Sequence, residues 1–160
     1  MPEVWLPARV KRLRGGRFAL RITGAERDVL RSLPAQLRQL MTGQDAGANL
    51  DLRRLFPTAY PDDPGKAAEY DAMVRDDLVA ERLAAIDVME RTIDSDRLSE
   101  EELLAWLSSI NDLRLVLGTR LDVPEDLSEL DVPPGDPRAE SLALYAYLSI
   151  LEEDAVAALS

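Results

Sequence analysis

Residues 99–119 read SEEELLAWLSSINDLRLVLGT, and this stretch decides the fold. Ser99 and Glu102 have the spacing of a capping box, in which each side chain satisfies the other residue's backbone N–H, so a helix begins there. Apolar residues lie around most of its circumference, which is typical of a helix at the centre of a protein. They are Leu103, Leu104, Trp106, Leu107, Ile110, Leu113, Leu115, Val116 and Leu117. The sequence therefore predicts a central helix that runs to about Thr119.

Two earlier segments also have helical periodicity. Thr23 and Glu26 form a second capping box, and the apolar residues that follow are spaced three or four apart, at Val29, Leu33, Leu37 and Leu40. Pro34 lies inside this pattern, so we expect it to kink the helix or to start a second one. A longer helix is predicted from about Lys66 to Ile93.

The last helix is predicted to follow an acidic loop. Asp136 is a favoured capping residue, and Pro137 fits the first helical position, where a missing N–H does no harm. The loop itself, residues 122–136, contains three prolines. Residues 43–65 are expected to form another loop, with one short helical turn near residues 52–56.

Residues 8–22, ARVKRLRGGRFALRI, have the pattern of a β-hairpin. The two adjacent glycines form a two-residue turn that accepts positive φ at both positions. The expected register then places Leu13 opposite Phe18 and Lys11 opposite Leu20. An isolated two-stranded hairpin is marginal in water, so this one must pack on the body of the protein or on a partner.

The chain has 160 residues, which is the length of one domain. We expect a mainly α fold: a bundle of four to five helices with an N-terminal two-stranded β-hairpin. A single domain, residues 1–160, is predicted, with residues 8–22 as a basic arm and residues 23–160 as the helical body. No stretch has the length and apolarity of a signal or membrane helix, so we expect a cytoplasmic protein without membrane contact.

The sequence contains no Cys and no His. Their absence excludes disulfides, thiol nucleophiles, Ser-His-Asp and Cys-His arrangements, and imidazole metal ligands. There is also no glycine-rich phosphate loop and no Gly-x-Ser-x-Gly motif. We therefore predict that the protein is not an enzyme and has no catalytic residue, no metal site and no cofactor.

Charge is distributed unevenly along the chain. Residues 1–58 hold 11 of the 19 Lys and Arg and only 5 of the 30 Asp and Glu, whereas the formal net charge of the whole chain is -11. The hairpin cations are candidates for contact with a protein partner or with DNA, since a two-stranded ribbon can enter a DNA groove. They are Arg9, Lys11, Arg12, Arg14, Arg17 and Arg21. The alternatives are a solvated face, pairing with this protein's own acids, above all the acidic loop, and contact within a homodimer.

Four polar residues interrupt the predicted central helix: Asn111, Asp112, Arg114 and Arg120. A charge on a buried helix is costly unless it is paired, so we expect partners such as Asp87 or Glu90. The arrangement is either a structural ion-pair network that fixes the register of the helices or a polar site for a ligand or for catalysis in the core.

Three segments together resemble an actinobacterial family of unknown function. They are RLFPTAYPDDP at residues 54–64, followed by Glu69 and Tyr70; WLSSINDLRLVLGTRLDV at residues 106–123, the most specific of the three; and LYAYLSILEEDAV at residues 144–156. Members of this family have a similar length and begin with a basic strand pair. They are often encoded near the Clp protease adaptor and near cysteine-biosynthesis genes, and they include the actinomycete oxidative stress regulator, a redox-responsive transcriptional regulator.

The resemblance implies a regulatory protein that acts through protein contacts or DNA. A sensor that works by a cysteine pair needs two cysteines, and this chain has none, so the redox switch does not carry over. The sequence therefore predicts a non-enzymatic, transcription-associated regulator that acts by protein–protein contact, with the transcription machinery as one partner to test. Direct DNA binding through the hairpin, and a small-molecule or catalytic site in the bundle core, are the alternatives.

Overall fold

The computed structural model describes residues 7–42, 64–121 and 132–160, with residues 64–76 described as backbone only. The described chain contains four helices: α1 (Gly24–Thr42), α2 (Pro64–Arg91), α3 (Glu100–Leu121) and α4 (Ala139–Leu159). It also contains three short strands: β1 (Val10–Arg12), β2 (Arg17–Leu20) and β3 (Arg97–Ser99). The mainly α fold with an N-terminal strand pair is confirmed. The short helical turn predicted near residues 52–56 lies outside the described residues.

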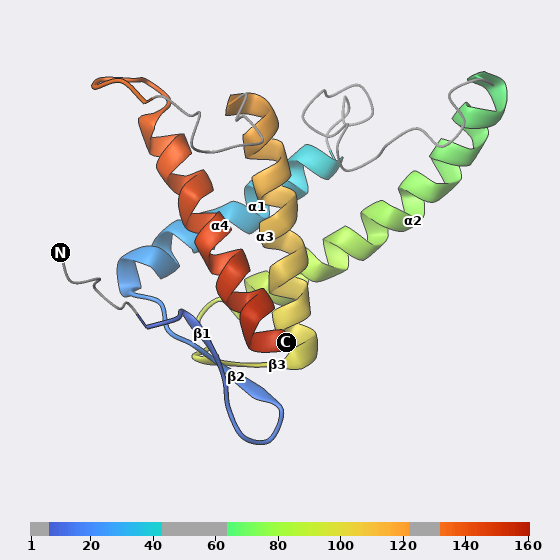
Figure 1. Cartoon of the computed structure of the whole chain (residues 1–160). Coiled ribbons are helices and arrows are strands. Elements are labelled where there is room, and N and C mark those ends of the chain that lie inside the picture. The colour runs from blue at the N-terminus through green and yellow to red at the C-terminus, as the bar shows by residue number, and fades with distance from the viewer. Residues whose placement is uncertain (1–6, 43–63, 122–131) are drawn as a thin grey trace.

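Helix α3 occupies the centre of the fold. It packs against α2 on one side and α4 on the other, and its N-terminal end meets the small sheet (Figure 1). Trp106, Leu103 and Ile110 of α3 are each only 1% exposed. They share one hydrophobic core with residues of α1, α2, α4 and all three strands. The apolar circumference of this helix is therefore covered from several directions, as the sequence predicts.

Both predicted capping boxes are formed. The Thr23 N–H donates to Glu26 Oε2 at 2.7 Å, and the Glu26 N–H donates to Thr23 Oγ1 at 3.1 Å. Ser99 and Glu102 exchange the corresponding bonds at 2.8 and 3.1 Å. Pro34 does not start a second helix: α1 continues through it, and Pro34 is buried on the core side of the helix.

The predicted start of the last helix is wrong by two residues. Helix α4 begins at Ala139, and its N-cap position is Arg138, which has no side-chain cap. Asp136 instead accepts the backbone N–H of Arg138 at 2.8 Å and also binds its guanidinium at 3.0 Å. This local pair holds residues 136–138 as a turn, so the helix begins after them.

The hairpin extends into a three-stranded antiparallel sheet, because β3 pairs with β2. The predicted register is wrong by one residue: Val10 lies opposite Leu20, and Arg12 lies opposite Phe18. The connection has three residues rather than two, since Arg14 joins the glycines and the Leu13 N–H donates to Arg17 O at 2.8 Å. Arg12 therefore shares a face with Phe18, and its guanidinium lies 5.2 Å from the centre of that ring.

The sheet packs on this protein's own helices. Val10, Phe18, Leu20 and Leu98 are at most 4% exposed and belong to the common core. Arg12 also donates to the carbonyl oxygens of Ala158 and Leu159, each at 3.0 Å, which joins β1 to the end of α4. These contacts supply the support that an isolated hairpin lacks.

Within the described part of the chain, none of the helices combines the length and the apolarity needed to cross a membrane.

The buried indole N–H of Trp106 has a threonine hydroxyl as its hydrogen-bond acceptor, and the contribution of this bond to stability can be tested. Its indole N–H donates to Thr92 Oγ1 at 2.7 Å, and the Thr92 hydroxyl donates to Val88 O at 2.7 Å. Thr92→Val keeps the shape but leaves the buried indole N–H without an acceptor, which should lower the free energy of unfolding by about 1–3 kcal/mol. The measurement is urea denaturation followed by tryptophan fluorescence.

Thr119→Val is the matched control. Its hydroxyl makes a similar bond to the carbonyl of Leu115, at 2.9 Å, but no indole is seen to depend on it. We expect a change below about 0.5 kcal/mol for this variant. Equal losses in the two variants would show that the indole bond contributes nothing.

Candidate functional site

The outer face of the sheet is basic. Lys11, Ala19 and Arg97 form one row across the three strands, because Lys11 pairs with Ala19 and Ala19 pairs with Arg97. Arg17 is the first residue of β2, and Arg21 directly follows its last residue. The four cations are exposed. We call Lys11, Arg17, Arg21 and Arg97 the basic sheet face.

Among the described residues, no acid pairs with any cation of this face. The acids just before β3 are held elsewhere: Asp94 binds Arg31 of α1 at 2.7 Å, and Asp96 binds Arg27 of α1 at 3.1 Å. Hydrogen bonds from Arg31 lower the pKa of Asp94. The positive charge of the face is therefore left for an external partner or for solvent.

The six hairpin cations that the sequence singles out have four different environments. Lys11, Arg17 and Arg21 lie on the basic sheet face, and Arg14 is exposed at the hairpin tip. Arg12 binds the last carbonyls of α4. Arg9 turns toward the helices. Most of the acidic loop proposed to neutralise them lies outside the described residues, and its described end, Asp136, binds Arg138.

Arg9 fixes the base of the hairpin to α1 and α4. Its Nε donates to Glu26 Oε1 at 2.7 Å, its backbone N–H donates to Asp154 Oδ2 at 2.9 Å, and its guanidinium lies 5.2 Å from the centre of the Tyr147 ring. Partial burial alone would raise the pKa of Glu26, but its bonds from Thr23 and Arg9 lower it. Burial, followed by the charge of Glu26, raises the pKa of Tyr147 to about 12.

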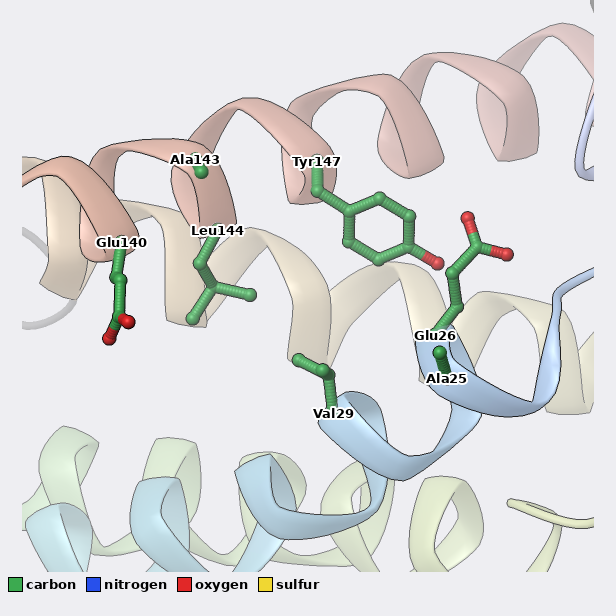
Figure 2. Close-up of a pocket in the computed structure, with 7 residues that line it drawn as sticks. All are labelled: Ala25, Glu26, Val29, Glu140, Ala143, Leu144 and Tyr147. Atoms are coloured by element: carbon green, nitrogen blue, oxygen red, sulfur yellow. The ribbon is translucent and has the colours of Figure 1, made fainter.

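A cleft of about 340 Å³ lies beside this contact, between α1 and α4. Its walls are apolar and are formed by Ala25, Val29, Ala143 and Leu144. Figure 2 shows Tyr147 and Glu26 at one end and Glu140 at the other. The volume is at the lower end of the range of small-molecule sites, about 300–1,000 Å³, so the cleft has room for a small group of side-chain size.

The polar residues of the central helix point to different neighbours. Asp112 is 2% exposed and pairs with Arg82 of α2. Burial raises the pKa of Asp112 in spite of the nearby guanidinium. Its second carboxylate oxygen accepts no hydrogen bond within the described part of the chain. Asp112 therefore carries an electrostatic cost that Arg82 only partly offsets.

Arg114 and Arg120 do not join that pair. Arg114 binds Glu152 and Ser149 of α4, the latter at 2.9 Å. Arg120 is exposed near the end of α3, and Asn111 is partly buried. Asp87 and Glu90, which the sequence suggests as partners for these residues, both bind Arg38 of α1 instead. Asp112 and Arg114 thus bind two different helices, α2 and α4, and the four residues are not gathered in one site.

The sequence patterns do not identify Arg97 as part of a basic face, Arg82 as the partner of Asp112, or the cleft. Arg97 belongs to a strand of three residues, which is too short to show an alternating pattern. The one available signal was its place directly before the Ser99 capping box, where the chain has to be non-helical. Arg82 and the cleft depend on helix contacts that no local pattern encodes.

These observations define a helical protein with an exposed basic face and an apolar cleft on another side. The chain matches the family DUF2017, a domain of unknown function, over residues 8–159. It belongs to this family, and the resemblance to an actinobacterial family of unknown function is confirmed.

Relatives in mycobacteria carry regulator names. A Mycobacterium leprae protein, named as a candidate oxidative stress regulator AosR, is 33% identical over 150 residues, covering 80% of this chain and 69% of its own length. The oxidative stress regulator AosR of Mycobacterium tuberculosis H37Rv is 27% identical over 186 aligned positions, covering 91% of this chain and 83% of its own length. No solved structure shows significant similarity to this chain.

The buried Asp112–Arg82 pair predicts a pH-dependent variant. Arg82→Met leaves the Asp112 carboxylate buried without this cation, and we expect a loss of about 2–4 kcal/mol in the free energy of unfolding at pH 7. The pKa of Asp112 is already raised in the folded state and rises further in the variant, so the folded form gains a proton as the pH falls. The loss relative to wild type should therefore shrink between pH 7 and pH 4.

Chemical denaturation across this pH range measures the effect. The double variant Arg82→Met, Asp112→Asn is the control, because it carries no buried charge at this position. Its difference from the single variant should be large at pH 7 and small at pH 4. A constant difference would show that Asp112 does not titrate as described.

Proposed function

We propose that this protein is a non-enzymatic regulator that acts by protein–protein contact through its basic sheet face, in association with transcription. Relatives that align with most of this chain are named oxidative stress regulators, which supports a regulatory role. The observation that carries the proposal is the basic sheet face, whose four exposed cations lie in or directly after the three strands and have no acid partner among the described residues.

An acidic protein surface suits this face better than DNA does. No aromatic side chain lies on its outer side: the one aromatic residue of the described strands, Phe18, is 1% exposed and points into the core. Base stacking is thus not provided by the strands. The net charge of the chain is -11, which opposes approach to a polyanion except in one orientation.

The polar contacts inside the helical body also favour a regulator over an enzyme. Several described polar groups of the core bind one another, as Arg114 binds Ser149 and Glu152 and as Asp112 binds Arg82. The buried Ser109 hydroxyl and the second Asp112 oxygen have no hydrogen-bond partner among the described residues. This supports a structural use of those residues and gives little support to a ligand or catalytic site in the bundle core. Because the chain has no cysteine, its regulation would have to use contacts rather than a thiol switch.

Affinity capture from a lysate of the source organism tests the proposal. The bait is wild-type protein or the variant Lys11→Gln, Arg21→Gln, Arg97→Gln, each with and without nuclease. We expect capture of RNA polymerase components or a sigma factor that resists nuclease and is lost with the triple variant. All three residues are exposed, so the helical circular dichroism signal should not change.

A matched pair of single variants sharpens this test. Arg97 on the face and Arg91 at the end of α2 are both exposed arginines. Arg97→Gln should weaken capture and Arg91→Gln should not. Loss of capture in both would mean that net charge rather than the face is responsible, and the proposal would fail.

Direct DNA binding gives a different result in the same experiment. Captured material would then be sensitive to nuclease. Engagement of the four cations of the face would give a slope of log affinity against log salt of about -3.6, measured on purified protein with duplex DNA. A flat response to salt, or no binding at low salt, would exclude this alternative.

A further inference from the structure

The cleft between α1 and α4 has an acidic rim. Glu140 of α4 lines the cleft, and Asp28 of α1 directly precedes Val29, which also lines it. Both acids are exposed, and neither forms an ion pair among the described residues, although the charge of Asp28 also acts on Arg31. The α1 cations Arg31 and Arg38 are held by acids at residues 87–94. Val29, which lines the cleft, is 47% exposed. A group that binds in this cleft should therefore have an apolar side chain for the walls and positive charges for the acidic rim.

The hairpin tip of this same chain has that chemistry. Leu13 is half-buried and lies opposite Arg17, and Arg14 is exposed beside it. Gly15 and Gly16 have φ of +79° and +73°, and a Cβ added to either would meet nothing within 4 Å. The tip thus carries one apolar residue with two arginines beside it, and the space that side chains would occupy at its two glycines is open among the described residues.

The tip cannot occupy its own cleft without unfolding the sheet. Arg9 holds the base of the hairpin against Glu26 and Tyr147, which form one end of the cleft. Arg12 holds β1 to the last turn of α4. From these anchors the hairpin runs away from the N-terminal half of α4, and its tip projects beyond the helices (Figure 1).

We infer that the cleft is a docking site for the hairpin tip of a second copy of this chain. Leu13 of one copy would enter the apolar cleft, and Arg14 and Arg17 would meet Asp28 and Glu140 of the other. Such an interface joins two different surfaces, so it is head-to-tail and forms a ring or a chain of copies. If the proposed function also holds, association would cover Arg17 and compete with the partner.

Sedimentation velocity of the purified full chain over a range of concentrations tests the inference. Wild type should associate as concentration rises. The tip variant Arg14→Glu, Arg17→Glu and the cleft variant Asp28→Arg, Glu140→Arg should each weaken association by about tenfold or more, because like charges then meet. The control variant Glu101→Arg, Glu153→Arg changes two exposed acids that do not line this cleft and should associate as wild type does.

A mixing experiment identifies the geometry. In an equal mixture each tip meets a cleft of opposite charge on the other variant, so the mixture should associate as wild type does, with the two variants in equal amounts, although neither variant associates well alone. Combining all four substitutions in one chain should restore association. If either reversed-charge variant loses its helical signal, Arg14→Gln and Glu140→Gln provide the same comparison.

Wild type that stays monomeric at every concentration overturns the inference. So does association that neither variant weakens, since another surface would then be responsible. These failures are distinct from failure of the proposed function, because the capture experiment substitutes Lys11, Arg21 and Arg97, which are not at the tip.

Discussion

Burial of α3 on several sides is the constraint on which the rest of the structure depends. A helix in this position can carry polar groups only if its neighbours satisfy them. The Trp106 indole donates to Thr92, which directly follows α2. Asp112 pairs with Arg82 of α2, and Arg114 pairs with Glu152 of α4. These contacts join α2 and α4 to particular positions along α3.

The same constraint creates the basic sheet face. The capping box that starts α3 requires a non-helical residue at Ser99, so the three residues that end there are free to pair as β3. Pairing with β2 buries Leu98 beside Phe18 and turns Arg97 outward beside Ala19. A hairpin of marginal stability thereby becomes the middle and edge of a sheet fixed to the core, and its outward cations acquire a fourth member from a distant part of the sequence.

Local chemistry explains which features could be predicted from the sequence. The capping boxes at Thr23 and Ser99 and the apolar circumference of α3 involve residues close in the chain, and these predictions are confirmed. The hairpin register was not predictable from the two glycines, because whether Arg14 joins the turn depends on which residues the core buries. The partners of Asp112 and Arg114, and the cleft, depend on helix packing between segments 30 or more residues apart.

Arg9 connects the cleft with the basic sheet face. Its side chain lies against Tyr147 and Glu26, which close one end of the cleft, while its backbone carbonyl accepts the N–H of Arg21, a member of the basic sheet face. Whatever fills the cleft therefore contacts residues that hold the base of the hairpin. A protein without cysteine or histidine has few titratable or redox-active groups with which to respond near neutral pH. If binding in the cleft changed the position of the basic sheet face, the protein could be regulated without a cysteine or a histidine.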